Sequence, residues 1–168
     1  MVPVRIGILA DTHDNLPMVD RAVARLTALS PDLALHAGDF VSPFVIPRVA
    51  ALPCPCIGVF GNNDGDRGLL AAKAGESGRV EIHGSFMARL IDGRSVALLH
   101  GHEAGAVEEI AGAGIFDLVV HGHTHRPSVT RQGHTLLVNP GEACGYLTGR
   151  GTVAVLETGP MEVRILEI

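Results

Sequence analysis

Six short segments of this sequence are rich in Asp, Asn, His and Gly, and they carry its most evident chemistry. Each follows an apolar run, and they begin at Asp11, Gly38, Gly61, His100, His121 and Asn139. The chain has nine histidines in 168 residues, and most of them lie in these segments. Imidazole nitrogen and carboxylate oxygen, without thiolate, suit Mn, Fe, Zn, Ni or Co better than a structural zinc site. The segments therefore predict a catalytic metal site.

The spacing within the segments indicates how their side chains could share ions. In an extended chain, residues i and i+2 point to the same side, so His123 and His125 can address one ion. They can serve two neighbouring ions if the backbone turns, and the same holds for Asp11 and His13. Asp39 has two carboxylate oxygens and can bridge two cations. Two cations about 3.5–4 Å apart form the clamp that enzymes use for in-line displacement at phosphorus.

The first half of the chain alternates apolar runs with helical patterns. Runs at 4–10, 33–36 and 57–60 predict buried strands, whereas 16–29 and 45–52 have helical spacing, with Asn15 as N-cap of the first. This alternation is typical of βαβ units and a parallel sheet. Ligands of such sheets bind beyond the carboxyl ends of the strands, where the polar segments lie.

The second half contains more strands than one doubly wound sheet needs. Asp92-Gly93 is a hairpin signal between two of them. We expect a helix at 104–113 and strands at 79–83, 86–91, 94–99, 118–120, 128–131, 135–138, 152–157 and 161–166. Two packed sheets with helices outside fit this count. The length and the lack of a linker or repeat predict one domain over residues 1–168.

Composition excludes several classes of function. The net charge of -5 and the shortage of aromatic residues, with one Tyr and no Trp, argue against a long nucleic acid as partner. Three cysteines are too few for a secreted disulfide scaffold. The N-terminus lacks signal-peptide features, and no apolar run approaches the roughly 18 residues of a membrane span. We expect a cytoplasmic protein that does not cross a membrane, and a homo-oligomer is compatible with the sequence.

The ordered motifs resemble those of a known family. Asp-x-His, Gly-Asp, Gly-Asn-x-Asp, His-Gly-His and Gly-His-Thr-His occur in this order, as in the calcineurin-like metallophosphoesterases. The short chain, the segment 121–125 and Asn139-Pro140-Gly141 look most like the small bacterial and archaeal phosphodiesterase branch. The resemblance implies an α/β fold, a four-layer α/β/β/α sandwich of two mixed β-sheets flanked by helices.

The resemblance also implies two divalent transition-metal ions and a ligand for each motif. Metal 1 would bind Asp11, His13, Asp39 and His125. Metal 2 would share the bridging Asp39 and bind Asn62, His100 and His123. We expect manganese, with Fe, Ni, Zn or Co as alternatives, because the same nitrogen and oxygen set serves them all. A water that bridges the ions would be the nucleophile.

The sequence departs from the wider family at one informative position. Many phosphatases of this fold carry His directly after the ligand Asn, where it helps to protonate the leaving group, but here that position is Asn63. Asn63 can bind a phosphoryl oxygen but cannot supply a proton, so efficient hydrolysis of monoesters with poor leaving groups is in doubt. His102 is a candidate for the missing acid or for a phosphate contact, and Arg67 is a candidate phosphate contact.

Further polar residues are expected to support the ligands. Asp64 is expected to bond its own loop or to orient a ligand, and His121 to hold its loop by hydrogen bonds. Asn15 could orient His13, as an alternative to capping the helix. Glu142 stands where a small residue is more typical of the branch, and we expect it to alter the mouth of the pocket.

The expected function is hydrolysis of a small phosphodiester by a water or hydroxide that bridges two metal ions. A phosphomonoesterase or a nucleotide pyrophosphatase on the same centre is the first alternative. A non-catalytic binding scaffold is the second, because the family includes a retromer subunit that uses this fold to hold partner proteins. This sequence has a residue that can bind a metal at each of the seven ligand positions, which favours an enzyme.

Overall fold

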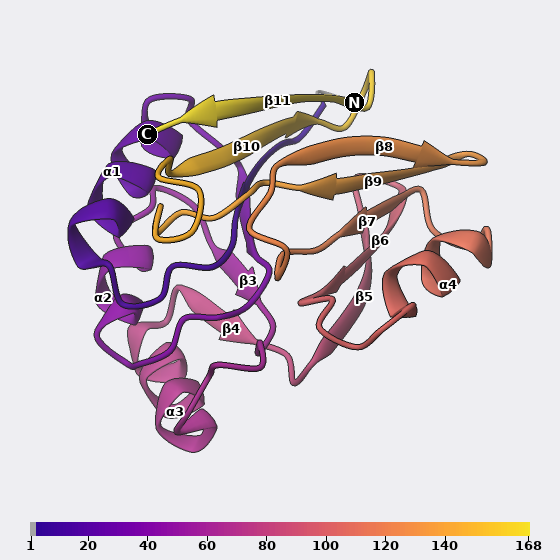
Figure 1. Cartoon of the computed structure of the whole chain (residues 1–168). Coiled ribbons are helices and arrows are strands. Elements are labelled where there is room, and N and C mark those ends of the chain that lie inside the picture. Colours follow the sequence, from indigo (N-terminus) through magenta and orange to yellow (C-terminus); the bar gives the residue numbers. More distant parts are fainter. Residues whose placement is uncertain (1–2) are drawn as a thin grey trace.

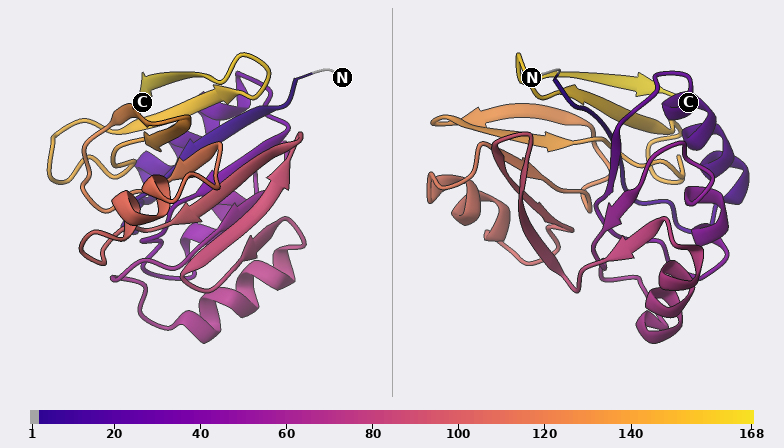
Figure 2. Two further views of the ribbon diagram at one scale, coloured as in Figure 1. Left: turned by 90° about the vertical axis from the view of Figure 1, so that its right-hand side faces the viewer. Right: turned by 180° about the vertical axis from the view of Figure 1, so that it is seen from behind.

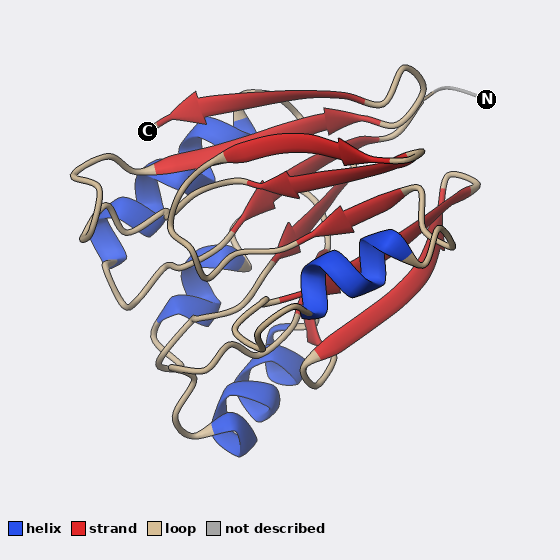
Figure 3. Ribbon diagram, turned by 45° about the vertical axis from the view of Figure 1, so that its right-hand side comes forward, coloured by secondary structure: helices blue, strands red, loops and turns tan. Residues whose placement is uncertain are grey.

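The computed structural model describes residues 3–168 and places two β-sheets face to face between outer helices. Figure 1 shows α1, α2 and α3 on the outer side of one sheet, and α4 on the outer side of the other. The view from behind in Figure 2 and the oblique view in Figure 3 show the same four layers. The four-layer α/β/β/α sandwich expected from the sequence is confirmed.

The first sheet has six strands in the order β11-β10-β1-β2-β3-β4. Strands β1 to β4 are parallel, whereas β10 is antiparallel to both β1 and β11. The strands are β1 (Arg5–Leu9), β2 (Leu33–His36), β3 (Cys56–Gly58), β4 (Val80–Ile82), β10 (Thr152–Glu157) and β11 (Glu162–Glu167).

The second sheet has five strands in the order β5-β6-β7-β9-β8. Strands β6, β7 and β9 are parallel, and β5 and β8 are antiparallel edge strands. The strands are β5 (Phe86–Ile91), β6 (Arg94–Leu99), β7 (Leu118–Val120), β8 (Ser128–Gln132) and β9 (Thr135–Asn139).

The helices bury one apolar side each against a sheet. Helix α1 (Leu16–Thr27) buries Val19, Ala22 and Leu26, the helical spacing seen in the sequence. The others are α2 (Val45–Val49), α3 (Arg67–Ser77) and α4 (Ala106–Gly112). The core between the two sheets is built by residues such as Ile8, Leu98 and Val120.

Helix α3 is absent from the elements that the sequence predicted. The sequence did not predict this helix because its apolar periodicity is weak and because it contains two internal glycines, Gly68 and Gly75. Its ends do carry signals: the Asp66 side chain accepts a hydrogen bond from Leu69 N at 2.9 Å, and Gly78 closes the helix at a φ of 63°. Helix α2 ends at Val49, three residues before the predicted end at residue 52.

The parallel strands of both sheets bring the polar segments together. The carboxyl ends of β1, β2 and β3 lead into the segments at Asp11, Gly38 and Gly61. The carboxyl ends of β6 and β7 lead into those at His100 and His121 in the same way, and β9 ends at Asn139, where the last segment begins. The site is therefore shared between the two sheets.

Candidate metal centre

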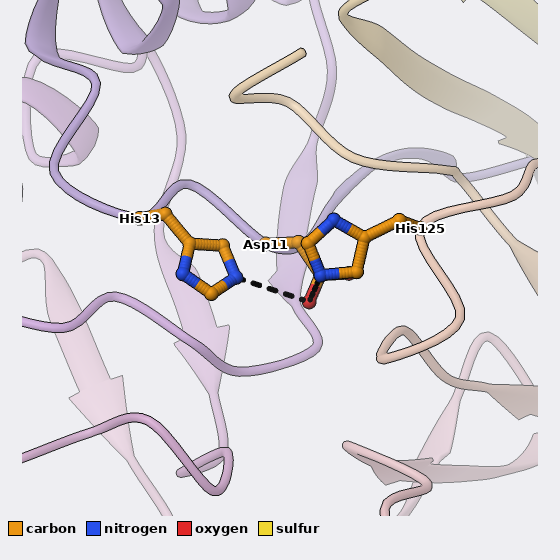
Figure 4. Close-up of side chains that lie close together, drawn as sticks. All are labelled: Asp11, His13 and His125. Atoms are coloured by element: carbon orange, nitrogen blue, oxygen red, sulfur yellow. Dashed lines mark ion pairs between the residues drawn. The ribbon is translucent and has the colours of Figure 1, made fainter. Parts of the chain in front are cut away.

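Two buried carboxylates lie at the centre of the site. Asp39 Oδ2 is 3.3 Å from the Nε2 atoms of both His13 and His100. Asp11 Oδ1 is 3.5 Å from His125 Nε2 and 3.8 Å from His13 Nε2 (Figure 4). The structure thus brings together five of the seven predicted ligands through their donor atoms.

The loop backbone turns these side chains inward. Five of the predicted ligands have a positive φ, which non-glycine residues rarely adopt: Asp11, His13, Asp39, His123 and His125. Thr124 N donates to Gly122 O at 2.8 Å, so the segment that carries the two later histidines is a turn. The segment therefore does not adopt the extended conformation, which was one of the two alternatives for these imidazoles.

Glycine allows the loops to approach the carboxylates. A Cβ atom at Gly61 would lie 2.1 Å from Asp39 Oδ1, and one at Gly122 would lie 2.9 Å from Asp11 Oδ2. Real contacts of this kind do not occur below 3.0 Å. These two positions consequently exclude any side chain as long as the carboxylates keep their places.

The polar atoms at the centre fit a bound cation. Within residues 3–168, the buried atoms Asp11 Oδ1, His13 Nε2 and His100 Nε2 have no hydrogen-bond partner. A buried polar atom without a partner costs about 1–3 kcal/mol. Nitrogen and carboxylate lone pairs that converge in this way are the donor set of a divalent transition metal.

The charges in the metal-free site are strongly coupled. The carboxylates of Asp11 and Asp39, which lie 3.8 Å and 3.3 Å from Nε2 of His13, raise the pKa of this imidazole to about 9. Burial opposes ionisation of Asp39, but the nearby rings of His100 and His13 and the hydrogen bond from the Asn63 side chain hold the pKa of its carboxyl group far below its usual value. In the metal-free protein His13 therefore carries a proton at neutral pH, which an incoming cation would displace.

The remaining two predicted ligands, His123 and Asn62, contribute no donor atom to the contacts described above. The ring of His123 is 5.1 Å from the ring of His100, and His123 N donates to Asp11 Oδ2 at 3.1 Å. Asn62 is exposed in the turn after Gly61. Its neighbour Asn63 contacts Asp39 directly, through its backbone N at 2.9 Å and its side-chain amide at 2.8 Å.

The predicted substrate contacts flank the same cluster. The ring of His102 is 5.6 Å from the ring of His100, and its Nδ1 is buried with no partner in the described part of the chain. Arg67 donates to Gly61 O at 2.9 Å, and its guanidinium lies 5.2 Å from the centroid of the Phe60 ring. Arg67 thus holds the loop that precedes Asn62.

The predicted supporting residues bond the loops rather than one another. Asp64 accepts hydrogen bonds from the backbone N of Asp39, Val41 and Gly61. The side chain of Asn15 makes no cap for helix α1 and donates to Cys144 O at 2.8 Å.

The last of these supporting side chains lies in the turn after β7. His121 Nδ1 lies 3.3 Å from Gly122 O and 3.4 Å from the Asn139 amide nitrogen.

Glu142 is a functional candidate that the sequence placed wrongly. The expectation that it alters the mouth of the pocket is wrong, because its side chain is 0% exposed. Its Oε2 lies 2.7 Å from His125 Nδ1. Burial disfavours its charge, but hydrogen bonds from His125 and Thr148 lower the pKa of its carboxyl group to about 2. The signal in the sequence was a charged residue next to a glycine turn, without an indication of its depth.

A family model for the calcineurin-like phosphoesterase superfamily domain matches residues 4–160. Phosphodiesterase MJ0936 of Methanocaldococcus jannaschii is 37% identical over 161 residues, which cover 96% of this chain and 97% of that protein. The solved structure of an archaeal phosphodiesterase superposes with a TM-score of 0.92 at 36% identity, over 98% of this chain and 99% of the other.

A more distant structure shares the fold alone. Vps29 of Entamoeba histolytica, solved in complex with zinc, superposes with a TM-score of 0.70 at 18% identity, over 98% of each chain.

Within residues 3–168, none of the helices has the length and apolar character needed to cross a membrane. The family model spans most of the chain, and the Asp and His side chains of the polar segments meet in one site. The chain is a metal-dependent phosphoesterase that belongs to the calcineurin-like phosphoesterase superfamily.

Proposed function

We propose that the protein is a phosphodiesterase that binds two divalent transition-metal ions and hydrolyses a small phosphodiester. The observation that carries this proposal is the set of unpartnered buried atoms on Asp11, His13 and His100, which face one another around two carboxylates. The similarity to an archaeal phosphodiesterase supports the same substrate class.

We assign one set of ligands to each of the two proposed ions, and Asp39 belongs to both sets. One ion would be held by Asp11, His13, Asp39 and His125, and the other by Asp39, Asn62, His100 and His123. Such a pair of ions neutralises charge on the phosphoryl oxygens and makes a bound water acidic enough to attack phosphorus. Manganese as the ion and a cytoplasmic location stay predictions.

The protein's own side chains would position the phosphodiester beside these ligands. Asn63 holds Asp39 through two hydrogen bonds and would offer its amide to a phosphoryl oxygen. His102, with its buried and unpartnered Nδ1, would contact the phosphate or protonate the leaving group. Arg67 is committed to Gly61 O and would reach a phosphate only with its other donors.

The choice of a diester over a monoester rests on Asn63. A monoester with a poor leaving group needs a proton donor there, whereas a diester whose leaving group is a good one does not. The alternative of a phosphomonoesterase or a nucleotide pyrophosphatase would require His102 to supply that proton. Turnover of a monoester, a diester and a dinucleoside polyphosphate by the same preparation separates these activities.

The proposal is tested with metal-free protein reconstituted with Mn(II), Ni(II), Co(II) or Zn(II). We expect hydrolysis of an activated aryl phosphodiester, and a loss of at least about a hundredfold in the His100→Ala variant. His134→Ala is the matched control, because His134 is exposed in the turn that precedes β9, at the opposite end of that strand from the site. Absence of diesterase activity with all four ions would contradict the proposal and would favour a binding scaffold.

A further inference from the structure

Glu142 is the most deeply buried acidic side chain near the site that no step of the proposed function uses. It lies in the loop between β9 and β10, and its side chain is 0% exposed. Its Oε2 lies 2.7 Å from Nδ1 of His125. A charged group buried in this way is costly unless its hydrogen bonds are satisfied.

Both carboxylate oxygens of Glu142 accept several hydrogen bonds. Oε1 accepts from Leu147 N at 3.0 Å, from Thr148 N at 2.6 Å and from Thr148 Oγ1 at 2.7 Å. Oε2 accepts from His125 Nδ1 and from Cys144 Sγ, the latter at 3.1 Å. The ligand atoms of His125, Glu142 and Cys144 lie close enough for an ion. The carboxylate has no free lone pair for one, so this group is a support and not a third metal site.

The contact fixes the tautomer of His125. A carboxylate accepts hydrogen bonds and does not donate, so the proton of the neutral ring lies on Nδ1. The lone pair of His125 is thereby on Nε2, which faces Asp11 Oδ1 at 3.5 Å. A histidine ligand whose second nitrogen donates to a carboxylate is held in orientation and is more basic toward its metal.

The histidine on the other side of Asp39 has a different partner. His100 Nδ1 donates to the backbone carbonyl of Ala37 at 2.8 Å, a neutral acceptor. Asp11 also lies on the side of His125, since its Oδ1 is closer to His125 Nε2, at 3.5 Å, than to His100 Nε2, at 4.0 Å. More negative charge therefore surrounds the ion that His125 would bind.

We propose that Glu142 is a positioning residue that makes the ion site of Asp11, His13, Asp39 and His125 the tighter of the two. The site would fill first as the metal concentration rises, and the site of His100 and His123 would fill second. This inference rests on the two-ion site of the proposed function. Removal of such a supporting carboxylate typically weakens metal affinity by about 10- to 100-fold.

The test is a calorimetric titration of the metal-free full-length protein with Zn(II). We expect two classes of site in the wild type. The Glu142→Gln variant keeps the shape of the side chain and removes its charge, so we expect the tighter class to weaken by about 10- to 100-fold. The weaker class should keep its affinity. Identical isotherms for the variant and the wild type would overturn the inference.

Thr148→Val is the matched control for a role in the loop alone. It removes one donor to Oε1 and leaves the contact between Oε2 and His125 in place. We expect wild-type affinities for both sites. An equal loss in this variant would show that Glu142 acts by anchoring the loop, which would also overturn the inference. A wild type that binds no Zn(II) would instead contradict the proposed function.

A second measurement tests the inference on the wild type, in case the Glu142→Gln variant does not fold. In the zinc-loaded wild type, nitrogen NMR of the histidine rings should show a slowly exchanging proton on His125 Nδ1, with zinc on Nε2. Zinc on Nδ1 of His125, or a rapidly exchanging proton there, would overturn the assignment of Glu142 to this ring.

Discussion

Asp39 uses its two carboxylate oxygens for different tasks. Oδ1 accepts the backbone N–H of Asn63, and Oδ2 faces His13, His100 and the Asn63 side chain. Asn63 thus holds both oxygens of the carboxylate, whereas the histidines approach Oδ2 alone. A bridging role needs this division, because an oxygen that faces a cation has to be held in place by donors elsewhere.

The proton on His13 leads to a prediction for metal binding. The pKa of about 9 lies above neutral pH, so the metal-free protein holds a proton there that a cation has to displace. We expect Zn(II) binding to release protons at pH 7 and to tighten as the pH rises toward 9. Calorimetry in buffers with different ionisation enthalpies measures the release. A binding enthalpy independent of the buffer would contradict this prediction.

Asn63 leads to a prediction for substrate preference. The Asn63→His substitution introduces a group that can donate a proton to the leaving group, and such groups contribute about 10²- to 10⁴-fold. We expect the ratio of monoester to diester turnover to rise by at least about tenfold. Asn63→Ala is the control, because it removes the hydrogen bond to Asp39 without adding an acid. An equal ratio in both variants would speak against this role.

At the scale of the elements, the loops position the site because small residues let them come close. Gly61→Ala would place a Cβ 2.1 Å from Asp39 Oδ1, so the carboxylate or the loop has to move. We expect Zn(II) affinity and diesterase activity to fall by at least about tenfold, as is typical when a supporting contact of a metal ligand is lost.

The matched control for this substitution lies in helix α3. A Cβ at Gly75 meets nothing within 4 Å, so Gly75→Ala should leave the site unchanged. It should also stabilise the protein by about 0.5–1 kcal/mol, since alanine loses less entropy in a helix than glycine. Equal losses of metal affinity in the two variants would refute the steric explanation.

His36, at the end of β2, leads to a prediction for stability. It is buried against Phe40, with 3.7 Å between ring centroids. Its Nδ1 accepts from Gly38 N, and its Nε2 lies 3.1 Å from Thr12 Oγ1. Burial lowers the pKa of His36 to about 3. The folded protein therefore keeps this ring neutral at pH values where the unfolded chain protonates it.

The sign of the pH effect follows from this difference. Between pH 6.5 and about 3 the unfolded state binds the extra proton, so the free energy of unfolding falls as the pH falls. The slope is about 1.4 kcal/mol per pH unit for one proton. Urea unfolding of the metal-free protein at pH 6.5 and 5 measures it. His36→Asn should reduce the slope by this amount, and equal slopes would contradict the prediction.

The sequence predicts most of the elements because their patterns are local. Strands β2, β5, β6 and β7 have the predicted bounds. Each is a short run of strand-forming residues, and polar or turn residues mark where it begins and ends. The conformations at His123 and His125 were less predictable, because a positive φ at a non-glycine residue depends on tertiary contacts. The depth of Glu142 depends on Leu147 and Thr148, which fold back over it from later in the same loop.

At the scale of the whole molecule, the candidate site joins the two sheets. Asp11 and Asp39 follow strands of the first sheet, whereas His100, His123 and His125 follow strands of the second. The order of the motifs in the sequence predicted that these residues would meet. It could not predict the distances between them, because the packing of one sheet against the other is set by side chains spread along the whole chain.

A metal ion bound at the junction of the two sheets should stabilise the fold. A ligand that binds the folded state alone adds about 2.7 kcal/mol at a concentration 100 times its dissociation constant. We expect Zn(II) to raise the thermal midpoint in a concentration-dependent way and EDTA to reverse the shift. Asp39→Asn should abolish most of the increment, because the carboxylate lies between His13 and His100.

A core variant separates this increment from the intrinsic stability. Leu98→Ala truncates a fully buried side chain between the sheets and should cost about 2–5 kcal/mol with and without metal. Because the site itself is unchanged, the increment from Zn(II) should persist in this variant. An increment of wild-type size in Asp39→Asn, or its loss in Leu98→Ala, would mean that the ion stabilises the protein at some place other than the junction of the two sheets.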